Sequence, residues 1–355
     1  MKNFILLLML TSIWSISFGQ KKTEAENLVK EGIAAHDKGD YNGAISKYDK
    51  ALKLDKDNLW ALTEKGVTLV ALQHYEEAIN YCQKAIATHP GNEALKTVYV
   101  TYGNAADGLK KTDMAIEIYD EGITRFPDFY QLYYNKGISL ASAGSIDEAM
   151  LCFQNAIMLN PDHAGSHNAI ARISNFTNNR IPALLAYWRF LVLEPDGSRA
   201  HENLESMQKL MNANVEQNSK DSVSVHYNSE MFGDTTNNGS QAENNFVQTD
   251  LILSMDVARD FLPEFKKNTD VEKFIRKLTT VCESLNENKK TGFGFSWDYY
   301  VPYFIEMKEK HFIETYAYIA FISSNDPKVI KWLNAHNSEM ENFLKWSTSF
   351  DWKSK

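Results

Sequence analysis

Leu59 to Asn92 reads LWALTEKGVTLVALQHYEEAINYCQKAIATHPGN, and this stretch decides the fold. Its apolar residues recur at helical spacing in two runs, Leu62 to Leu69 and Tyr75 to Ala85. The segment 72–74 separates the runs, and Pro90 ends the second because proline cannot continue a helix. Two short amphipathic helices cannot bury their apolar faces alone. The pattern therefore predicts that further copies of the pair stack against this one.

Several residues of this stretch occupy the positions that mark the tetratricopeptide repeat, a helix–turn–helix unit of about 34 residues. They are the glycine of the first helix, the aromatic residue at the turn, the alanines of the second helix and the closing proline: Gly66, Tyr75, Ala78, Ala85 and Pro90. The stretch therefore resembles this family. The resemblance implies an all-α fold in which repeats stack into a right-handed superhelix, followed by whatever the rest of the chain forms.

The same pattern recurs along the first half of the chain and deviates most in its last copy. There Ala171 replaces the glycine and Phe190 replaces the second alanine, while Ala183, Tyr187 and Pro195 remain. A helical segment after this copy would cover the exposed end of the array, as a terminal cap must. The expected divisions are a signal peptide (1–19), five repeats (25–58, 59–92, 96–129, 130–163 and 164–197), a capping helix (198–214), a flexible linker (215–245) and a small helical C-terminal domain of no recognised family (246–355).

The linker and the C-terminal domain are distinguished by composition. Residues 215–245 are rich in Ser, Asn, Gly and Thr and poor in large apolar residues, so they cannot bury enough surface to offset chain entropy. From Phe246 the apolar periodicity returns, with Pro263 ending a first helix and Thr269 capping a second. The helices expected in this domain cover residues 251–262, 270–286, 297–322, 327–335 and 337–347.

Two triplets in the predicted linker carry a candidate modification signal. Asp221-Ser222-Val223 and Asp234-Thr235-Thr236 are similar to the Asp-Ser/Thr-apolar sites at which some bacteria O-glycosylate exported proteins. The similarity implies Ser222 and Thr235 as candidate acceptors. A pattern of three residues also arises by chance, and both interpretations stay open.

The N-terminal residues MKNFILLLMLTSIWSISFGQ combine one lysine, an apolar run and small residues before Gln20. This layout is typical of a secretory signal, so we expect cleavage before Gln20 and a mature protein that is periplasmic or secreted. The alternative is an uncleaved membrane anchor, because the run from Asn3 to Gly19 is close to the length that spans a bilayer. No later stretch is apolar enough to do so, and we expect no membrane span after signal cleavage.

Charge and cysteine content exclude several classes of function. The net charge is −9 and neither half of the chain gathers a basic patch, so nucleic-acid binding is not expected. The cysteines, Cys82, Cys152 and Cys282, are odd in number and widely spaced. They indicate neither a disulfide framework nor a zinc site, and Cys82 is interpreted as a packed core thiol.

We find no arrangement of residues that indicates an enzyme. A Gly-rich phosphate loop, a Gly-x-Ser-x-Gly elbow and a His-Glu-x-x-His helix are all absent from the sequence, and no cofactor or metal is expected. The rival hypothesis places an enzyme or envelope-ligand site in the C-terminal domain, with the repeats as a targeting arm. That site would be a pocket that collects His311, Glu314, Asp298 and tyrosines. His311 and Glu314 share a helical face, which is more often a solvated surface.

The repeat surface is the better candidate. The resemblance implies that first helices line a concave groove and that the second, fifth, ninth and twelfth residues of each repeat face it. From the second repeat onward, the residues predicted to bind a partner by this rule are Trp60, Thr63, Val67, Asn104, Tyr134, Ile138, Asn168, Arg172 and Asn175, and the same positions include Val70, Thr97, Val100, Asp107, Gln131, Ala141 and Gly165. Aromatic anchors beside amides suit an extended peptide or a helix of another protein.

Two alternatives qualify this expectation. Some members of the family hold a C-terminal carboxylate with Lys and Asn, but the matching residues here are Val29 and Ile33, so that clamp is absent. The groove residues could also contact the N-terminal extension or the C-terminal domain of the same chain. A separate aromatic cluster in GFGFSWDYY and the residues after it is interpreted as core, with a ligand-stacking or docking patch as the alternative: Phe293, Phe295, Trp297, Tyr299, Tyr300, Tyr303 and Phe304.

Overall fold

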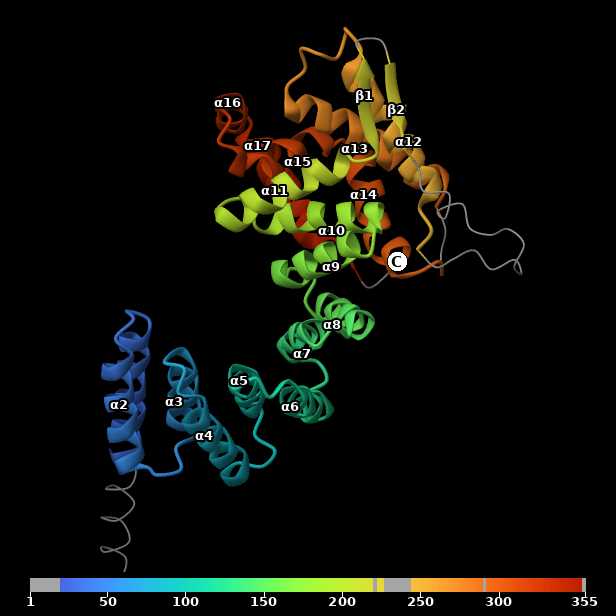
Figure 1. Ribbon diagram of the computed structural model, residues 1–355. Helices are drawn as coiled ribbons and strands as arrows, with labels where there is room; N and C mark the ends of the chain where they lie inside the picture. The colour runs from blue at the N-terminus through green and yellow to red at the C-terminus, as the bar shows by residue number, and fades with distance from the viewer. Residues whose placement is uncertain (1–19, 220–221, 227–243, 290–291, 353–355) are drawn as a thin grey trace, which may run out of the picture. The chain divides into compact units, whose positions relative to one another are not determined.

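The computed structural model describes residues 20–219, 222–226, 244–289 and 292–352 (Figure 1). The described residues are helical apart from turns, loops and one two-stranded hairpin, so the predicted all-α fold of helix–turn–helix repeats is confirmed. The chain forms two compact units, residues 1–155 and 156–355, and each is described by itself below. The predicted signal peptide lies outside the described residues.

The first unit consists of consecutive helix pairs that match the predicted repeats. Residues 20–36 form the first helix of repeat one. The helices that follow are α2 (Tyr41–Leu54), α3 (Leu59–Ala71), α4 (Tyr75–Thr88), α5 (Leu95–Gly108), α6 (Thr112–Arg125), α7 (Tyr130–Ser142) and α8 (Ile146–Leu159), whose last residues belong to the second unit. From α2 to α7 each helix packs on the next, as α3 does on α4 and α5 on α6, which buries the apolar faces that a single pair leaves exposed.

The turn inside each pair has the same backbone geometry. The residue at its tip has a positive φ in every repeat, whether it is glycine, as at Gly39 (79°) and Gly144 (84°), or a larger residue, as at Gln73 (61°) and Lys110 (62°). The left-handed conformation is easiest for glycine. The turn therefore persists in copies that lack its preferred residue, because packing of the two helices holds it.

The glycine of the first helix is required where the second helix presents an aromatic ring. A Cβ atom at Gly103 would lie 2.3 Å from the ring of Tyr119, whereas one at Gly66 would lie 3.4 Å from the Sγ of Cys82. Cys82 is buried, as predicted, and burial raises the pKa of its thiol to about 12. The small thiol of Cys82 therefore leaves room for a Cβ atom at position 66 in repeat two, whereas the ring of Tyr119 leaves none at position 103 in repeat three.

This difference gives a matched pair of substitutions at equivalent positions. We expect Gly103→Ala to destabilise the first unit by about 1–3 kcal/mol, because the ring of Tyr119 must move within a packed core. We expect Gly66→Ala to be neutral or to stabilise by up to about 1 kcal/mol, since alanine favours the helix. Thermal unfolding followed by circular dichroism measures both. Equal costs at the two positions would contradict the proposed role of the ring.

The second unit contains the fifth repeat together with all the C-terminal helices. Thr269 caps α13 through a reciprocal capping box with Glu272, and a positive φ at His311 (61°) splits the predicted helix 297–322 in two. The elements are α9 (Ala164–Phe176), α10 (Arg180–Leu193), α11 (Ser198–Met211), β1 (Val215–Ser219), β2 (Ser222–Val225), α12 (Val247–Ala258), η2 (Arg259–Phe261), α13 (Asp270–Glu287), α14 (Phe295–Glu309), α15 (Ile313–Ala320), η3 (Ile322–Ser324), α16 (Pro327–Ala335) and α17 (Asn337–Ser349).

Helix α10 is the centre of this unit. It packs against α9, α11, α12, α14 and α15, and every residue from Arg180 to Val192 is buried. A helix that is apolar on all sides must be covered on all sides. The structure therefore differs from the expected division, in which residues 246–355 form a domain apart from the fifth repeat. The C-terminal helices are instead the cover of that repeat.

The predicted linker also differs from the structure at its start. Residues 215–219 and 222–225 pair as an antiparallel hairpin that contacts α12, with Val215 opposite Val225. Backbone pairing and this contact order a segment whose side chains alone predict no fold. Ser222, a candidate glycosylation residue, is exposed in β2, and Thr235 lies outside the described residues.

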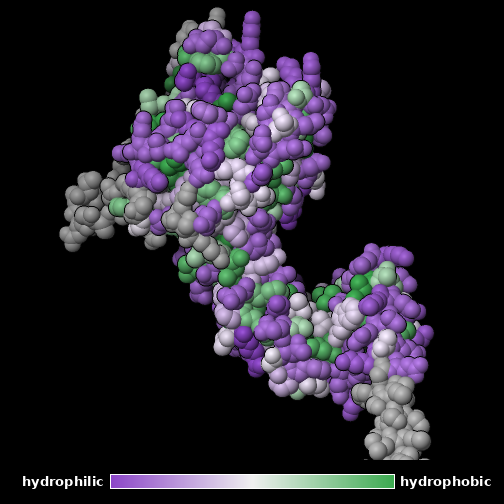
Figure 2. All heavy atoms as spheres, turned by 180° about the vertical axis from the view of Figure 1, so that it is seen from behind, coloured by the Kyte–Doolittle hydropathy of each residue, from purple (hydrophilic) through white to green (hydrophobic). Residues whose placement is uncertain are grey.

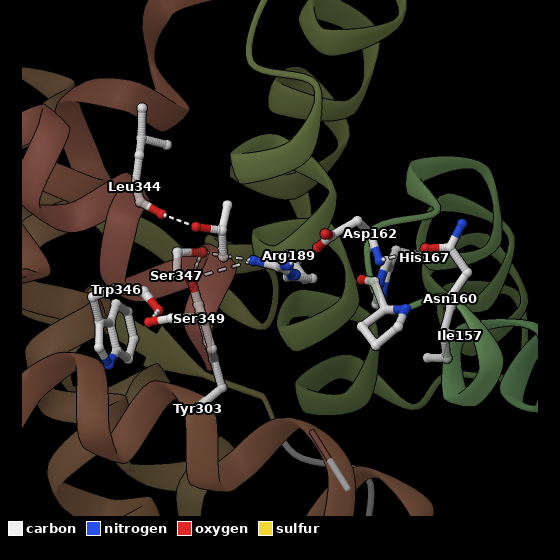
Figure 3. A network of polar contacts seen from close by, with 12 residues as sticks. Ile157, Asn160, Asp162, His167, Arg189, Tyr303, Leu344, Trp346, Ser347 and Ser349 are labelled. Atoms are coloured by element: carbon white, nitrogen blue, oxygen red, sulfur yellow. Dashed lines mark hydrogen bonds and ion pairs between the residues drawn. The ribbon is translucent and has the colours of Figure 1, made fainter. Parts of the chain in front are cut away.

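Two buried arginines on α10 join this helix to its surroundings. The guanidinium of Arg189 donates to Asp162 (2.7 Å) and to Ser347 on α17 (2.8 Å) (Figure 3). It also lies over the ring of Trp352. Arg180 donates to Asp250 on α12 (2.6 Å) and to the carbonyl oxygens of the last turn of α11. Both contacts fix segments that are distant in sequence.

The aromatic cluster belongs to this core, which confirms the packing interpretation. Trp297, Tyr300, Tyr303 and Phe304 are buried on α14. Tyr300 hydrogen-bonds through its hydroxyl to Nδ1 of His167 (2.8 Å), and burial lowers the pKa of this histidine to about 3. His167 is therefore a neutral core residue at physiological pH.

Candidate partner-binding surface

The first helices of successive repeats lie side by side in the first unit. Helix α3 packs against α5, and α5 packs against α7. The same polar contact also recurs between the first helices of neighbouring repeats: Nδ1 of His36 lies 2.8 Å from Oγ1 of Thr68, and Ser139 donates to the carboxylate of Asp107. We call the side of α3, α5 and α7 formed by their predicted groove positions the first-helix surface.

Two large apolar side chains are exposed on this surface, one at each end. The exposed fraction is 38% for Trp60 on α3 and 43% for Ile138 on α7. Val67 and Val70 on α3 and Tyr134 on α7, which also occupy predicted groove positions, are half-buried. Hydrophilic residues cover most of the face seen in Figure 2. Exposed apolar groups of this size on one row of helices are candidates for contact with another molecule.

Other predicted groove residues are engaged within the repeats. Asn104 accepts a hydrogen bond from the hydroxyl of Tyr119 (2.7 Å). Thr63 donates to the carbonyl oxygen of Leu59 (2.8 Å). Both side chains remain half-buried, and their contacts serve the helix pair itself. The tyrosine in the second helix of repeat three is the sequence signal that accounts for the role of Asn104.

The residues predicted at the fifth-repeat end of the groove belong to the second unit. Asn168 is half-buried and its Oδ1 has no hydrogen-bond partner among the described residues. Arg172 and Asn175 are exposed. Asn175 also lines a polar cavity of about 650 Å³ together with Arg180 and Asp250. The structure thus divides the predicted groove residues between two units, and the first-helix surface carries those of repeats two to four.

Two lysines of the first helices are held by side chains on second helices. Nζ of Lys65 donates to Asp49 (2.5 Å) and to the hydroxyl of Tyr81 (2.6 Å), which both lie on second helices. Lys136 makes the equivalent contact with Asp120 (2.5 Å). Each lysine therefore joins a first helix to the preceding second helix. The sequence analysis missed this recurring ion pair, although the spacing of sixteen residues is the same in both copies.

Two carboxyl groups on or beside this surface, those of Glu64 and Asp107, are not paired with a lysine or arginine among the described residues. Glu64 accepts a hydrogen bond from the indole Nε1 of Trp60 (3.2 Å) and makes no ion pair among the described residues. Burial raises the pKa of Glu64, and it also raises that of Asp107 despite the hydrogen bond from Ser139. The first-helix surface therefore combines apolar groups with partly buried carboxylates.

The residues of the rival enzyme hypothesis do not form one site. Asp298 is in the first turn of α14 and accepts a hydrogen bond from the backbone of Gly292 (2.9 Å). His311 follows the other end of this helix, about 15–20 Å away along the axis, and both His311 and Glu314 are exposed. The neighbouring tyrosines are core residues. The part of the chain that the structure describes contains no cluster of acidic, His or Cys side chains able to hold a metal.

Comparison with known proteins identifies the class to which this fold belongs. Models of the tetratricopeptide repeat match residues 35–100, 97–129 and 130–163. Residues 35–163 of the chain are therefore tetratricopeptide repeats. The matched residues begin at the end of the first helix of repeat one and run through the rest of the first unit to the start of the second.

Relatives and solved structures share this repeat region. The chain is 30% identical to the STIP1 homologue of Dictyostelium discoideum over 40% of its own length and 30% of that protein. It is 33% identical to a small glutamine-rich tetratricopeptide repeat-containing protein of the same organism, over 31% of the chain and 32% of the relative. The crystal structure of TTC0263, a TPR protein of Thermus thermophilus, aligns with a TM-score of 0.45 and covers 53% of this chain and 98% of that one. The two sequences are 18% identical.

Each match to a curated relative covers only part of that relative. The chain spans less than half the length of the curated relatives it matches, so the activities of those whole proteins are not carried over. Tetratricopeptide repeats generally mediate protein–protein interaction. Among the described helices, none has the length and apolar character needed to cross a membrane.

Proposed function

We propose that this chain is an exported scaffold protein, without enzymatic activity of its own, that binds a segment of another protein on the first-helix surface. The observation that carries the proposal is the exposure of Trp60 and Ile138 on stacked first helices. Binding energy in protein interfaces concentrates in a few large apolar or aromatic anchors that become fully desolvated. The other first-helix residues supply shape around these anchors.

The dimensions of the surface suit an extended or helical segment. Neighbouring helices pack about 8–10 Å apart, so α3, α5 and α7 present a strip of about 20 Å between their outer axes. A strip of this width holds a segment of about six extended residues at about 3.3 Å each. Peptide recognition by a row of helices needs no catalytic group, which agrees with the sequence.

Substitution of the exposed anchors tests the proposal. We expect Trp60→Ala combined with Ile138→Ala to weaken partner binding at least tenfold, because two anchors lose their contacts. The matched control is Leu151→Ala on α8, whose side chain is 59% exposed but lies on a second helix. Partners retained by the wild-type protein from an envelope fraction are quantified by mass spectrometry for all three chains. Equal retention by the double variant and the wild type would refute the role of this surface.

Export is the second part of the proposal. The N-terminal apolar run and the small residues before Gln20 support a cleaved signal peptide. N-terminal sequencing of the protein recovered from the native host should begin at Gln20. Recovery of the intact N-terminus in the membrane fraction would favour the anchor, and recovery from the cytoplasm would refute export.

A further inference from the structure

The groove positions of repeats two to four have an unusual charge. Across the second, fifth, ninth and twelfth residues of these repeats there is no Lys or Arg, and the single ionisable carboxyl group is Asp107. Glu64, which follows the groove residue Thr63, adds a second carboxyl group beside Trp60. Lys65 of α3 and Lys136 of α7 are paired with Asp49 and Asp120 on second helices, and Nζ of Lys96 on α5 lies over the ring of Phe129.

Glu64 has the stronger requirement for a cation. Its carboxylate is half-buried, accepts from one indole N–H and has no ion-pair partner among the described residues. Asp107, by contrast, accepts from Ser139 on the neighbouring first helix and is part of the stack. An ionised carboxylate that is partly desolvated without a cation is unfavourable, and its raised pKa reflects this. A cation from a partner would remove the penalty.

Trp60 provides a second reason for a cation at this point. Its indole donates to Glu64, yet 38% of the side chain remains exposed. A tryptophan face attracts the ammonium group of Lys or the guanidinium group of Arg. One cationic side chain could therefore contact the ring of Trp60 and the carboxylate of Glu64 together, while its methylene groups lie on apolar surface.

We propose that the segment bound by the first-helix surface carries Lys or Arg next to large apolar side chains, with the cation at Glu64 and Trp60. This inference rests on the proposed function and adds the chemistry of the partner. A segment that ends in a carboxylate, or that is rich in Asp and Glu, is disfavoured because it meets Glu64 and Asp107 without a Lys or Arg at the groove positions of repeats two to four.

Selection from a random peptide library tests the composition of the partner. The probe is a phage-displayed library of linear twelve-residue peptides, and the bait is the full mature chain. We expect peptides selected on the wild-type protein to contain at least about threefold more Lys and Arg than Asp and Glu. We also expect aromatic or aliphatic neighbours, and loss of binding to the Trp60→Ala, Ile138→Ala variant. Enrichment of acidic peptides, or no charge preference, would overturn the inference.

The affinity of one selected peptide then locates the cation. We expect Glu64→Gln to weaken binding of the basic peptide about tenfold, as expected for the loss of one charge-assisted contact. The same substitution should change the affinity of a Lys→Met version of the peptide less than twofold. Glu76→Gln, an exposed carboxylate on α4, is the matched control and should have no effect. Equal effects of Glu64→Gln on both peptides would overturn the assignment to Glu64.

Lowering the pH provides an independent readout. Glu64 must be ionised to hold the cation, and burial raises its pKa, so affinity for the basic peptide should fall as the pH is lowered towards that pKa. His36 and Asp37 in the first repeat also act on Glu64: His36 favours its charged form and Asp37 opposes it. Asp107 is the other carboxyl group of the surface whose pKa burial raises, so Glu64→Gln should weaken the pH dependence of binding. Peptides that bind through Trp60 but show neither charge preference nor pH dependence would leave the proposed function standing and end this inference. Peptides that bind the Trp60→Ala, Ile138→Ala variant normally would end both.

Discussion

A chain that ends at Asn214 is expected to lose the folded structure of α9, α10 and α11. The sequence pattern makes this position an apparent boundary, because the composition changes directly after it. In the structure, however, α12, α14 and α15 cover faces of α10 that the repeats leave open. The ring of Trp188 packs edge-on against those of Phe274 and Phe304, with ring centroids 6.3 Å and 5.4 Å apart. The truncation would remove both phenylalanines.

The size of the expected effect follows from the apolar groups exposed. Burial of each large side chain contributes about 1.5–3 kcal/mol, and Trp188 and Leu184 are among several on α10 that would return to water. The summed loss of burial free energy is comparable to the free energy of unfolding of a whole domain, about 5–15 kcal/mol. Hydrogen exchange should therefore show amide protection lost in α9–α11 and retained in α2–α6, which serve as the internal control. Protected amides in α10 of the truncated chain would refute this account.

Removal of the carboxylate at Asp250 is expected to have the largest effect of any single substitution. Asp250 and Arg180 form a buried ion pair in which the exposed fractions of the side chains are 7% and 5%. Burial already lowers the pKa of Arg180, which shows that desolvation opposes its charge. Asp250→Ala leaves this cation uncompensated, and the cost of breaking a buried pair in this way is about 3–5 kcal/mol.

A compensating variant separates charge from packing. We expect Arg180→Met combined with Asp250→Leu to recover most of the stability, because a buried pair is often replaceable by apolar groups of similar volume. The midpoint of urea unfolding, followed by circular dichroism, measures each variant. Glu31→Ala, which breaks an exposed ion pair with Lys47, is the control and should change the midpoint little. A double variant as unstable as Asp250→Ala would show that the pair also fixes geometry.

The repeats could be predicted because their constraints are local. Gly66, Ala78 and Pro90 each act within one helix pair, so their spacing specifies the pair and its copies. The N-cap of α13 and the helix that starts at Pro327 were found for the same reason, since a cap involves residues within one turn. Trp60 and Ile138 were placed at the surface correctly because repeat position fixes which side of a first helix they occupy.

The candidate site was predicted only in part, because a repeat position does not reveal what the side chain contacts. Asn104 holds the groove position that the resemblance implies, yet its partner is Tyr119 of the same repeat. Glu64 is outside the predicted set, and its importance appears only when the indole of Trp60 and the second-helix partner of Lys65 are seen. Asn168, Arg172 and Asn175 belong to a different compact unit from the rest.

The sequence by itself determined that the first half of this chain is an array of helix pairs with exposed apolar side chains on its first helices. That information is periodic and local, and it repeats from copy to copy. Only the tertiary structure decided where the array stops being independent: α10 is buried on every side, and helices as far along the chain as α15 cover it. Composition marks a boundary after Asn214, but burial of α10 sets the physical one, because apolar surface must be covered by whatever segment can reach it.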